Sequence, residues 1–105
     1  MSKAKDKGRR LENIVVKTLN DNDIPAKRVP LSGSLRGEYS DDIVIGTIEQ
    51  PIARIECKNR EQISKNLWEW LDNVDYLIVK KNQYKPLVIM DMDKFIELWN
   101  KGEQI

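Results

Sequence analysis

The first clear pattern of hydrophobic positions lies in residues 8–22. Apolar side chains recur there at intervals of three and four residues, at Leu11, Ile14, Val15 and Leu19. That spacing places them on one face of a helix, so a helix is predicted over this range. Glu12 lies at the border of the apolar stripe. The preceding residues 1–7 are rich in lysine and are expected to form a flexible basic N-terminus.

The rest of the chain alternates between short apolar runs and helical spacing. The apolar runs predict strands over residues 24–30, 42–46, 52–58, 76–79 and 87–90. Helical spacing predicts a second helix over residues 62–73, and Asp93 is suited to capping the N-terminus of a third. The order αβββαββα predicts an α/β protein with one mixed five-stranded sheet flanked by helices, in a single domain over residues 8–105.

Polar side chains interrupt the apolar pattern where two of these strands adjoin. Asp42 opens one strand, and Glu56-Cys57-Lys58 closes the next. Because side chains alternate between the faces of a strand, Glu56 and Lys58 are expected to share the face of Ile52 and Arg54. If the two strands pair as an antiparallel hairpin, the Asp42 and Glu56 carboxylates meet at one end of it. Two carboxylates in that position are suited to holding a divalent cation.

Composition narrows the chemistry that this arrangement can perform. The chain has 105 residues and no histidine, which excludes Ser-His and Cys-His nucleophiles and histidine-ligated metals. Cys57 is the only cysteine, so no intramolecular disulfide can form, as expected of a protein in a reducing cytoplasm. We expect neither a membrane span nor a signal peptide, because no apolar run is long enough. The groups that remain available for catalysis are carboxylates, lysines, hydroxyls and a bound metal.

Charge is distributed unevenly along the chain. Residues 1–36 carry a net charge of +5 and the remainder carries −4, although the whole chain is at only +1. A basic N-terminal third beside an acidic cluster suits a polyanion bound next to a metal site, while a solvated basic tail is the alternative. The polar loop Leu31–Gly37 contains Ser32 and Ser34, whose hydroxyls and neighbouring amides are suited to contacting phosphate.

Several of these motifs together resemble a known group of nucleases. Asp42 followed by Glu56-Cys57-Lys58 resembles the PD-(D/E)xK nuclease superfamily, whose members have the restriction-endonuclease-like fold. More narrowly, the chain is similar to the archaeal-type Holliday junction resolvases and related phage endonucleases. The segments that carry this narrower resemblance are Lys7–Glu12, Arg28–Pro30 with Ser32–Ser34, Asp42–Val44 and Ile55–Lys58.

The resemblance implies a role for each matching residue. Asp42 and Glu56 would bind Mg²⁺ directly, with Mn²⁺ as a possible substitute. Glu12 would approach the metal through water, and Lys58 would be the catalytic lysine. DNA contacts would come from Arg9, Arg10, Arg28, Ser32, Ser34 and Arg36. No organic cofactor is implied. Asp41 stands where the family usually has proline, so Asp41 competes with Asp42 as a ligand; Asp42 is favoured because it leads directly into Ile43.

The residues and the resemblance lead to three hypotheses about the function. The leading one is a Mg²⁺-dependent, structure-selective DNA endonuclease, most specifically a homodimeric Holliday junction resolvase. A nuclease of the same fold that acts on nicked, flapped or duplex DNA is the second, and a DNA-binding protein with a degenerate site is the third. An exposed cross-strand salt bridge is the structural alternative for Asp42, Glu56 and Lys58.

A homodimer is expected because a four-way junction has two-fold symmetry and two strands to cut. Trp68 and Trp70 lie two positions apart on the second predicted helix, so both cannot face one sheet. The apolar stripe of that helix assigns Trp70 to the interior and leaves Trp68 exposed for a second copy of the chain.

Overall fold

The helices and strands follow one another in the predicted order. The structure is a computed structural model that describes residues 3–30 and 42–103. Its elements are α1 (Lys3–Asp21), β1 (Ala26–Arg28), β2 (Ile43–Gly46), β3 (Pro51–Ile55), α2 (Asn66–Leu71), β4 (Leu77–Val79), β5 (Leu87–Ile89) and α3 (Met92–Glu103). The α/β class and the order αβββαββα are therefore confirmed.

The chain divides into two compact units, residues 1–60 and residues 61–105. The expected single nuclease domain over residues 8–105 stays a prediction. Among the described residues, no helix is long and apolar enough to cross a membrane.

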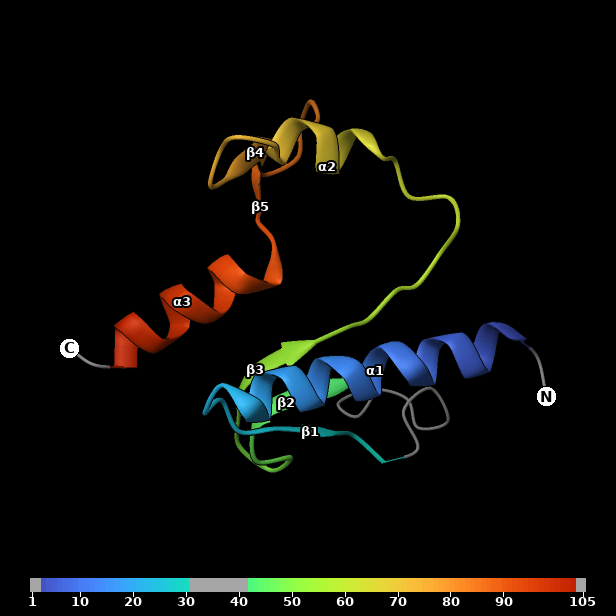
Figure 1. Cartoon of the computed structure of the whole chain (residues 1–105), viewed down its shortest axis with the longest axis vertical. Coiled ribbons are helices and arrows are strands. Elements are labelled where there is room, and N and C mark those ends of the chain that lie inside the picture. The colour runs from blue at the N-terminus through green and yellow to red at the C-terminus, as the bar shows by residue number, and fades with distance from the viewer. Residues whose placement is uncertain (1–2, 31–41, 104–105) are drawn as a thin grey trace. The chain divides into compact units, whose positions relative to one another are not determined.

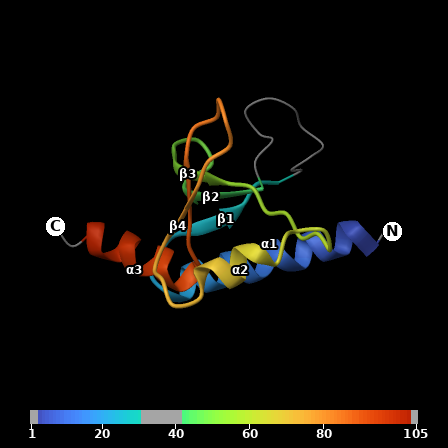
Figure 2. The same cartoon turned by 90° about the horizontal axis from the view of Figure 1, so that it is seen from above.

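Helix α1 lies along one face of the sheet formed by β1, β2 and β3 (Figures 1 and 2). It begins at Lys3, so residues 3–7, which were expected to be flexible, belong to the helix. Its inner face includes Leu11, Glu12, Val15 and Leu19, all of which are buried or half-buried. Ile14 was assigned to this face, but its side chain is 61% exposed. The assignment was wrong because the buried stripe is centred on the side of Glu12, away from Ile14.

The end of α1 is fixed by its own backbone and by β1. The Ile24 and Asp23 amides donate to the Leu19 and Asn20 carbonyls, and Asp23 has a φ of 66°. These are the bonds and the left-handed residue of a Schellman motif, in which apolar side chains also meet. Leu19 and Ile24 are accordingly both fully buried. The Asn20 side chain then binds the Ala26 amide and carbonyl, at 2.9 and 3.2 Å, which attaches β1 to the helix.

The sheet of the first unit is an antiparallel meander in the order β1-β2-β3. Its central strand aligns Ile43 with Arg28 on one side and with Ile55 on the other. The turn between β2 and β3 follows Gly46, the last residue of β2. This residue has a φ of 100°, and a Cβ there would lie 3.2 Å from the Ile52 nitrogen, so glycine is required.

Most of the buried hydrophobic side chains of the described residues belong to this first unit. They are Leu19, Ile24, Ala26, Val29, Ile43, Val44 and Ile45. All three apolar residues of β2 are in this set, so the central strand is buried on both faces. A rigid strand of this kind is a good support for a polar group at its entrance, which is where Asp42 lies.

The second unit holds a separate two-stranded sheet. β4 and β5 pair antiparallel, with Ile78 opposite Val88, and these two side chains are 60% and 57% exposed. The expected single five-stranded sheet is therefore not formed. Residues 56–65 form neither helix nor strand, and β4 pairs with β5 alone among the described residues. One face of β4 is therefore exposed, although all three of its residues are apolar.

Helix α3 begins two residues earlier than expected. The Asp91 carboxylate accepts a hydrogen bond from the Lys94 amide at 2.9 Å, so Asp91 is the N-cap, and Asp93 lies in the first turn. Farther along, the Phe95 and Trp99 rings pack with their centroids 5.7 Å apart. Helix α2 is shorter than predicted, and Trp68 and Trp70 are 62% and 55% exposed. The assignment of Trp70 to the interior was wrong because none of the residues of α2 is buried in this unit.

Candidate active site

Asp42 is held in place from both neighbouring strands. Its amide donates to the Ile55 carbonyl at 3.2 Å, and its carbonyl accepts from the Val29 amide at 3.0 Å. The carboxylate Oδ2 accepts a hydrogen bond from the Cys57 amide at 2.8 Å. The expected antiparallel hairpin is present, and it brings the Asp42 carboxylate to the main chain between Glu56 and Lys58.

Glu56 and Lys58 lie just beyond β3 and face solvent. Their side chains are 61% and 56% exposed, and the Lys58 Nζ lies 3.3 Å from the Glu56 Oε1. Ala53, Ile55 and Cys57 are half-buried, whereas Ile52 and Arg54 are exposed. The alternation predicted from the sequence is therefore confirmed, and it continues for three residues past the end of the strand.

The ion pair found here differs from the structural alternative considered for these residues. It joins Glu56 to Lys58 within one segment, whereas the cross-strand contact is the bond from Cys57 to Asp42. An exposed pair of this kind contributes about 0–1 kcal/mol to stability. Both side chains can therefore turn to another partner at little energetic cost.

Glu12 reaches the same end of the sheet from helix α1. Its side chain is only 15% exposed, and its Oε1 lies 3.1 Å from the Arg28 Nε of β1. A carboxylate on the inner face of a helix is costly unless it is paired, and Arg28 supplies the pairing charge. The Arg28 side chain is itself 43% exposed.

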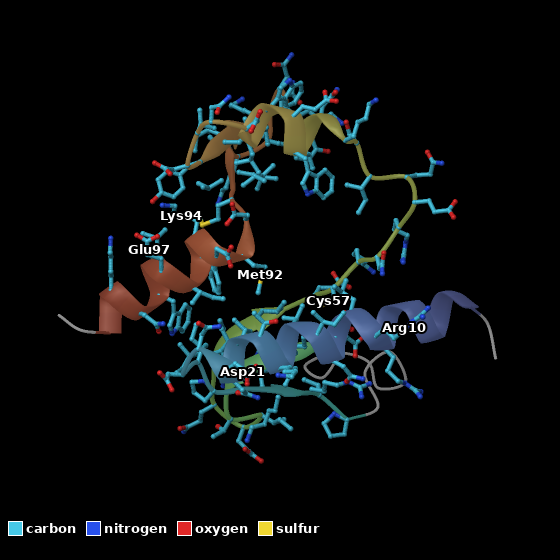
Figure 3. All side chains as sticks on the ribbon, viewed as in Figure 1. Arg10, Asp21, Cys57, Met92, Lys94 and Glu97 are labelled. Atoms are coloured by element: carbon cyan, nitrogen blue, oxygen red, sulfur yellow. The ribbon has the colours of Figure 1, made fainter. Side chains whose placement is uncertain are left out.

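The pKa of the Cys57 thiol is raised by its surroundings, which include these carboxylates. Burial, as the largest cause, and the negative charges of Asp42, Glu12 and Glu56 together raise its pKa from 9.0 to about 11. Figure 3 shows Cys57 just past the end of β3. Carboxylates from α1, from the entrance of β2 and from the exit of β3 thus act on one sulfur atom. We call Glu12, Asp42, Glu56 and Lys58 the acidic site.

The donor set of the acidic site suits a hard cation. Mg²⁺ binds oxygen ligands and commonly uses one or two carboxylates, with water completing its coordination. Among residues 3–30 and 42–103, no three acidic or cysteine side chains are close enough together to form a ready-made metal cluster. Asp42 and Glu56 as direct ligands, with Glu12 acting through water, stay a prediction.

The predicted DNA contacts are distributed between described and undescribed parts of the chain. Arg9 and Arg10 are exposed on α1, within one turn of Glu12. Arg28 lies on β1 and binds Glu12, a partnership that sequence reasoning missed because nothing in a sequence links residues 16 positions apart. The remaining candidates lie outside the described residues, namely Ser32, Ser34, Arg36 and the competing ligand Asp41.

Comparison of the chain with protein-family models, with curated proteins and with solved structures finds no match. A functional argument for this protein therefore depends on its own residues and their geometry.

The raised pKa of Cys57 predicts slow alkylation. Only the thiolate reacts, so a pKa near 11 in place of 9.0 lowers the reactive fraction at about pH 8 by about 100-fold. Iodoacetamide should label the native chain about 100-fold more slowly than the urea-unfolded chain, and the native rate should rise with pH until about pH 11. A native rate that levels off near pH 9 would show that the thiol is not surrounded as described.

Proposed function

We propose that this protein is a Mg²⁺-dependent, structure-selective DNA endonuclease, and most specifically a Holliday junction resolvase. One observation carries the proposal. The Asp42 carboxylate, at the entrance of β2, accepts a hydrogen bond from the Cys57 amide, which lies between Glu56 and Lys58. An acid-acid-lysine set at the end of a β-hairpin is what hydrolysis of a phosphodiester by this route requires.

Each residue of the acidic site has a task in the proposed reaction. Asp42 and Glu56 would hold Mg²⁺, which, when bound, neutralises phosphate charge and makes a bound water more acidic. Lys58 would orient the attacking water and, as an ammonium, stabilise the negative charge that develops on the phosphate. Its exposed ammonium, 3.3 Å from Glu56, is well placed to turn toward a phosphate. Water adds to phosphorus and gives up its proton to solvent, while the bond to the leaving oxygen breaks and that oxygen takes up a proton from solvent.

DNA would reach the acidic site along the basic N-terminal third. The exposed Arg9 and Arg10 precede Glu12 on α1, and Arg28 borders it on β1. Arginine and lysine contacts to phosphate supply most of the affinity in such complexes and make it dependent on salt. Ser32, Ser34 and Arg36 belong to the same proposal. We further propose a cytoplasmic setting, in keeping with the single cysteine.

The proposal includes a restriction-endonuclease-like architecture. The antiparallel meander followed by a helix and two more strands supports it, because this is the order of elements in that fold.

Cleavage of branched DNA tests the proposal directly. The substrates are a four-way junction, a flap, a nicked duplex and an intact duplex, each with Mg²⁺ and with EDTA. We expect Mg²⁺-dependent cleavage that is fastest on the junction. Faster cleavage of flaps or nicked duplex would favour the related nuclease, and binding without cleavage on any substrate would favour a DNA-binding protein.

Substitutions in the acidic site should separate chemistry from folding. Asp42→Asn keeps an acceptor for the Cys57 amide but removes the charge, so cleavage should be lost while the fold and DNA binding remain. Glu56→Gln should behave alike, and Lys58→Ala should lower the single-turnover rate by about 10²–10⁴-fold. Glu49→Gln, at the opposite end of the hairpin, is the matched control. An inactive Asp41→Asn with an active Asp42→Asn would reverse the ligand assignment.

The proposed homodimer uses the aromatic surface of α2. Trp68 and Trp70 are both largely exposed, so we expect Trp68→Ala and Trp70→Ala each to weaken dimerisation, by about 2 kcal/mol or more, with little effect on folding. Tyr76→Ala, another exposed aromatic position, is the control. Sedimentation at micromolar concentration measures the dimer. A 12.3 kDa monomer that still makes paired symmetric cuts would refute this part of the proposal.

A further inference from the structure

The turn between β4 and β5 borders an open hollow of about 340 Å³ that the acidic site does not use. We call residues 79–87 the lysine hairpin. The hollow is lined by Val79, Lys80, Lys81, Tyr84, Lys85 and Leu87. The Tyr84 amide donates to the Lys81 carbonyl at 3.0 Å, and Gln83 has a φ of 71°, so the turn has a defined backbone shape. A volume of this size is in the range of small-ligand sites.

The lysine hairpin is strongly basic within an acidic unit. It contains three lysines and no acid. The acids of residues 61–105 all lie elsewhere, at Glu61, Glu69, Asp72, Asp75, Asp91, Asp93, Glu97 and Glu103. Two of the remaining lysines, Lys94 and Lys101, are already paired with Asp75 and Glu97. Positive charge is therefore concentrated at one turn, where it favours an anionic partner.

The lining of the hollow combines this charge with apolar and aromatic surface. Val79 and Leu87 are cross-strand partners at the base of the hairpin. The Tyr84 side chain is 63% exposed, and the Lys81 ammonium lies 5.1 Å from the centre of its ring. One face of the ring is thus beside a cation. An apolar surface, an open aromatic ring and several lysines are the features with which proteins bind single-stranded nucleic acid.

We propose that the lysine hairpin binds an unpaired nucleotide of the DNA substrate. The base lies against Tyr84 over Val79 and Leu87, and the flanking phosphates are bound by Lys80, Lys81 and Lys85. The inference rests on the proposed function in one respect, namely that the substrate is DNA. It adds what that proposal lacks, a site in residues 61–105 that recognises the unstacked bases found at a branch point. An acidic peptide would use the lysines but would leave the apolar lining unfilled.

Binding of defined ligands to the full-length chain tests the proposal. Fluorescence anisotropy would measure affinity for a short single-stranded oligonucleotide, an intact duplex, a four-way junction and polyglutamate. Tyr84→Leu should weaken single-strand binding by about 5- to 150-fold, the loss expected for one stacked base. Tyr84→Phe should bind as the wild type does. Lys81→Ala should reduce the salt slope by about 0.7. Tyr76→Leu and Lys65→Ala are controls outside the hairpin.

The outcomes separate this proposal from the nuclease proposal. Tyr84→Leu binding as tightly as wild type, equal losses on duplex and single strand, or tighter binding of polyglutamate than of DNA would each overturn the hairpin site. Circular dichroism checks whether Tyr84→Leu still folds. If it does not fold, the salt slope of Lys81→Ala tests the hairpin site in its place. If the hairpin variants lose single-strand binding while wild type cleaves no DNA, the hairpin site stands and the nuclease proposal fails. Normal junction cleavage and binding by every hairpin variant would overturn the hairpin site alone.

Discussion

The hydrogen bond from the Cys57 amide to the Asp42 carboxylate is the interaction on which the acidic site depends. β3 ends at Ile55, and this bond continues its attachment to β2 for two residues more. Glu56 and Lys58, the neighbours of Cys57, are thereby kept at the entrance of the most deeply buried strand. A hydrogen bond to a charged group contributes about 1.5–3 kcal/mol, enough to order a short segment. Asp42 is thus both a structural residue and a candidate ligand.

A second constraint is the burial of Glu12 on the inner face of α1. Arg28 makes this possible, and the Asn20 contacts to Ala26 fix β1, and hence Arg28, relative to the helix. In the proposed nuclease, Arg28 also contacts phosphate, so DNA binding would alter the charge balance around Glu12. The acid on the helix and the DNA contact on the strand are therefore linked through one ion pair.

The sequence predicted what depends on local periodicity. The order of elements and the alternation from Ile52 to Lys58 follow from spacing and were confirmed. Features set by distant contacts were not predictable. Ile14 and Trp70 have apolar side chains at helical spacing, yet their exposure depends on what packs against each helix. The Arg28–Glu12 pair and the division of the strands between two sheets likewise depend on tertiary structure, which no local pattern encodes.

The proposed function depends on Asp42 and Glu56, with Glu12 acting through water, binding a divalent cation at the end of the β2–β3 hairpin. Mn²⁺ titration followed by amide NMR tests it most directly, because a paramagnetic ion broadens nearby signals whether or not the protein cleaves DNA. The account predicts that substoichiometric Mn²⁺ first broadens the amides of Asp42 and Cys57, then that of Glu12, and that Asp42→Asn removes the effect. Broadening centred on another acidic group, such as Asp91 and Asp93, with none at Cys57, would contradict it.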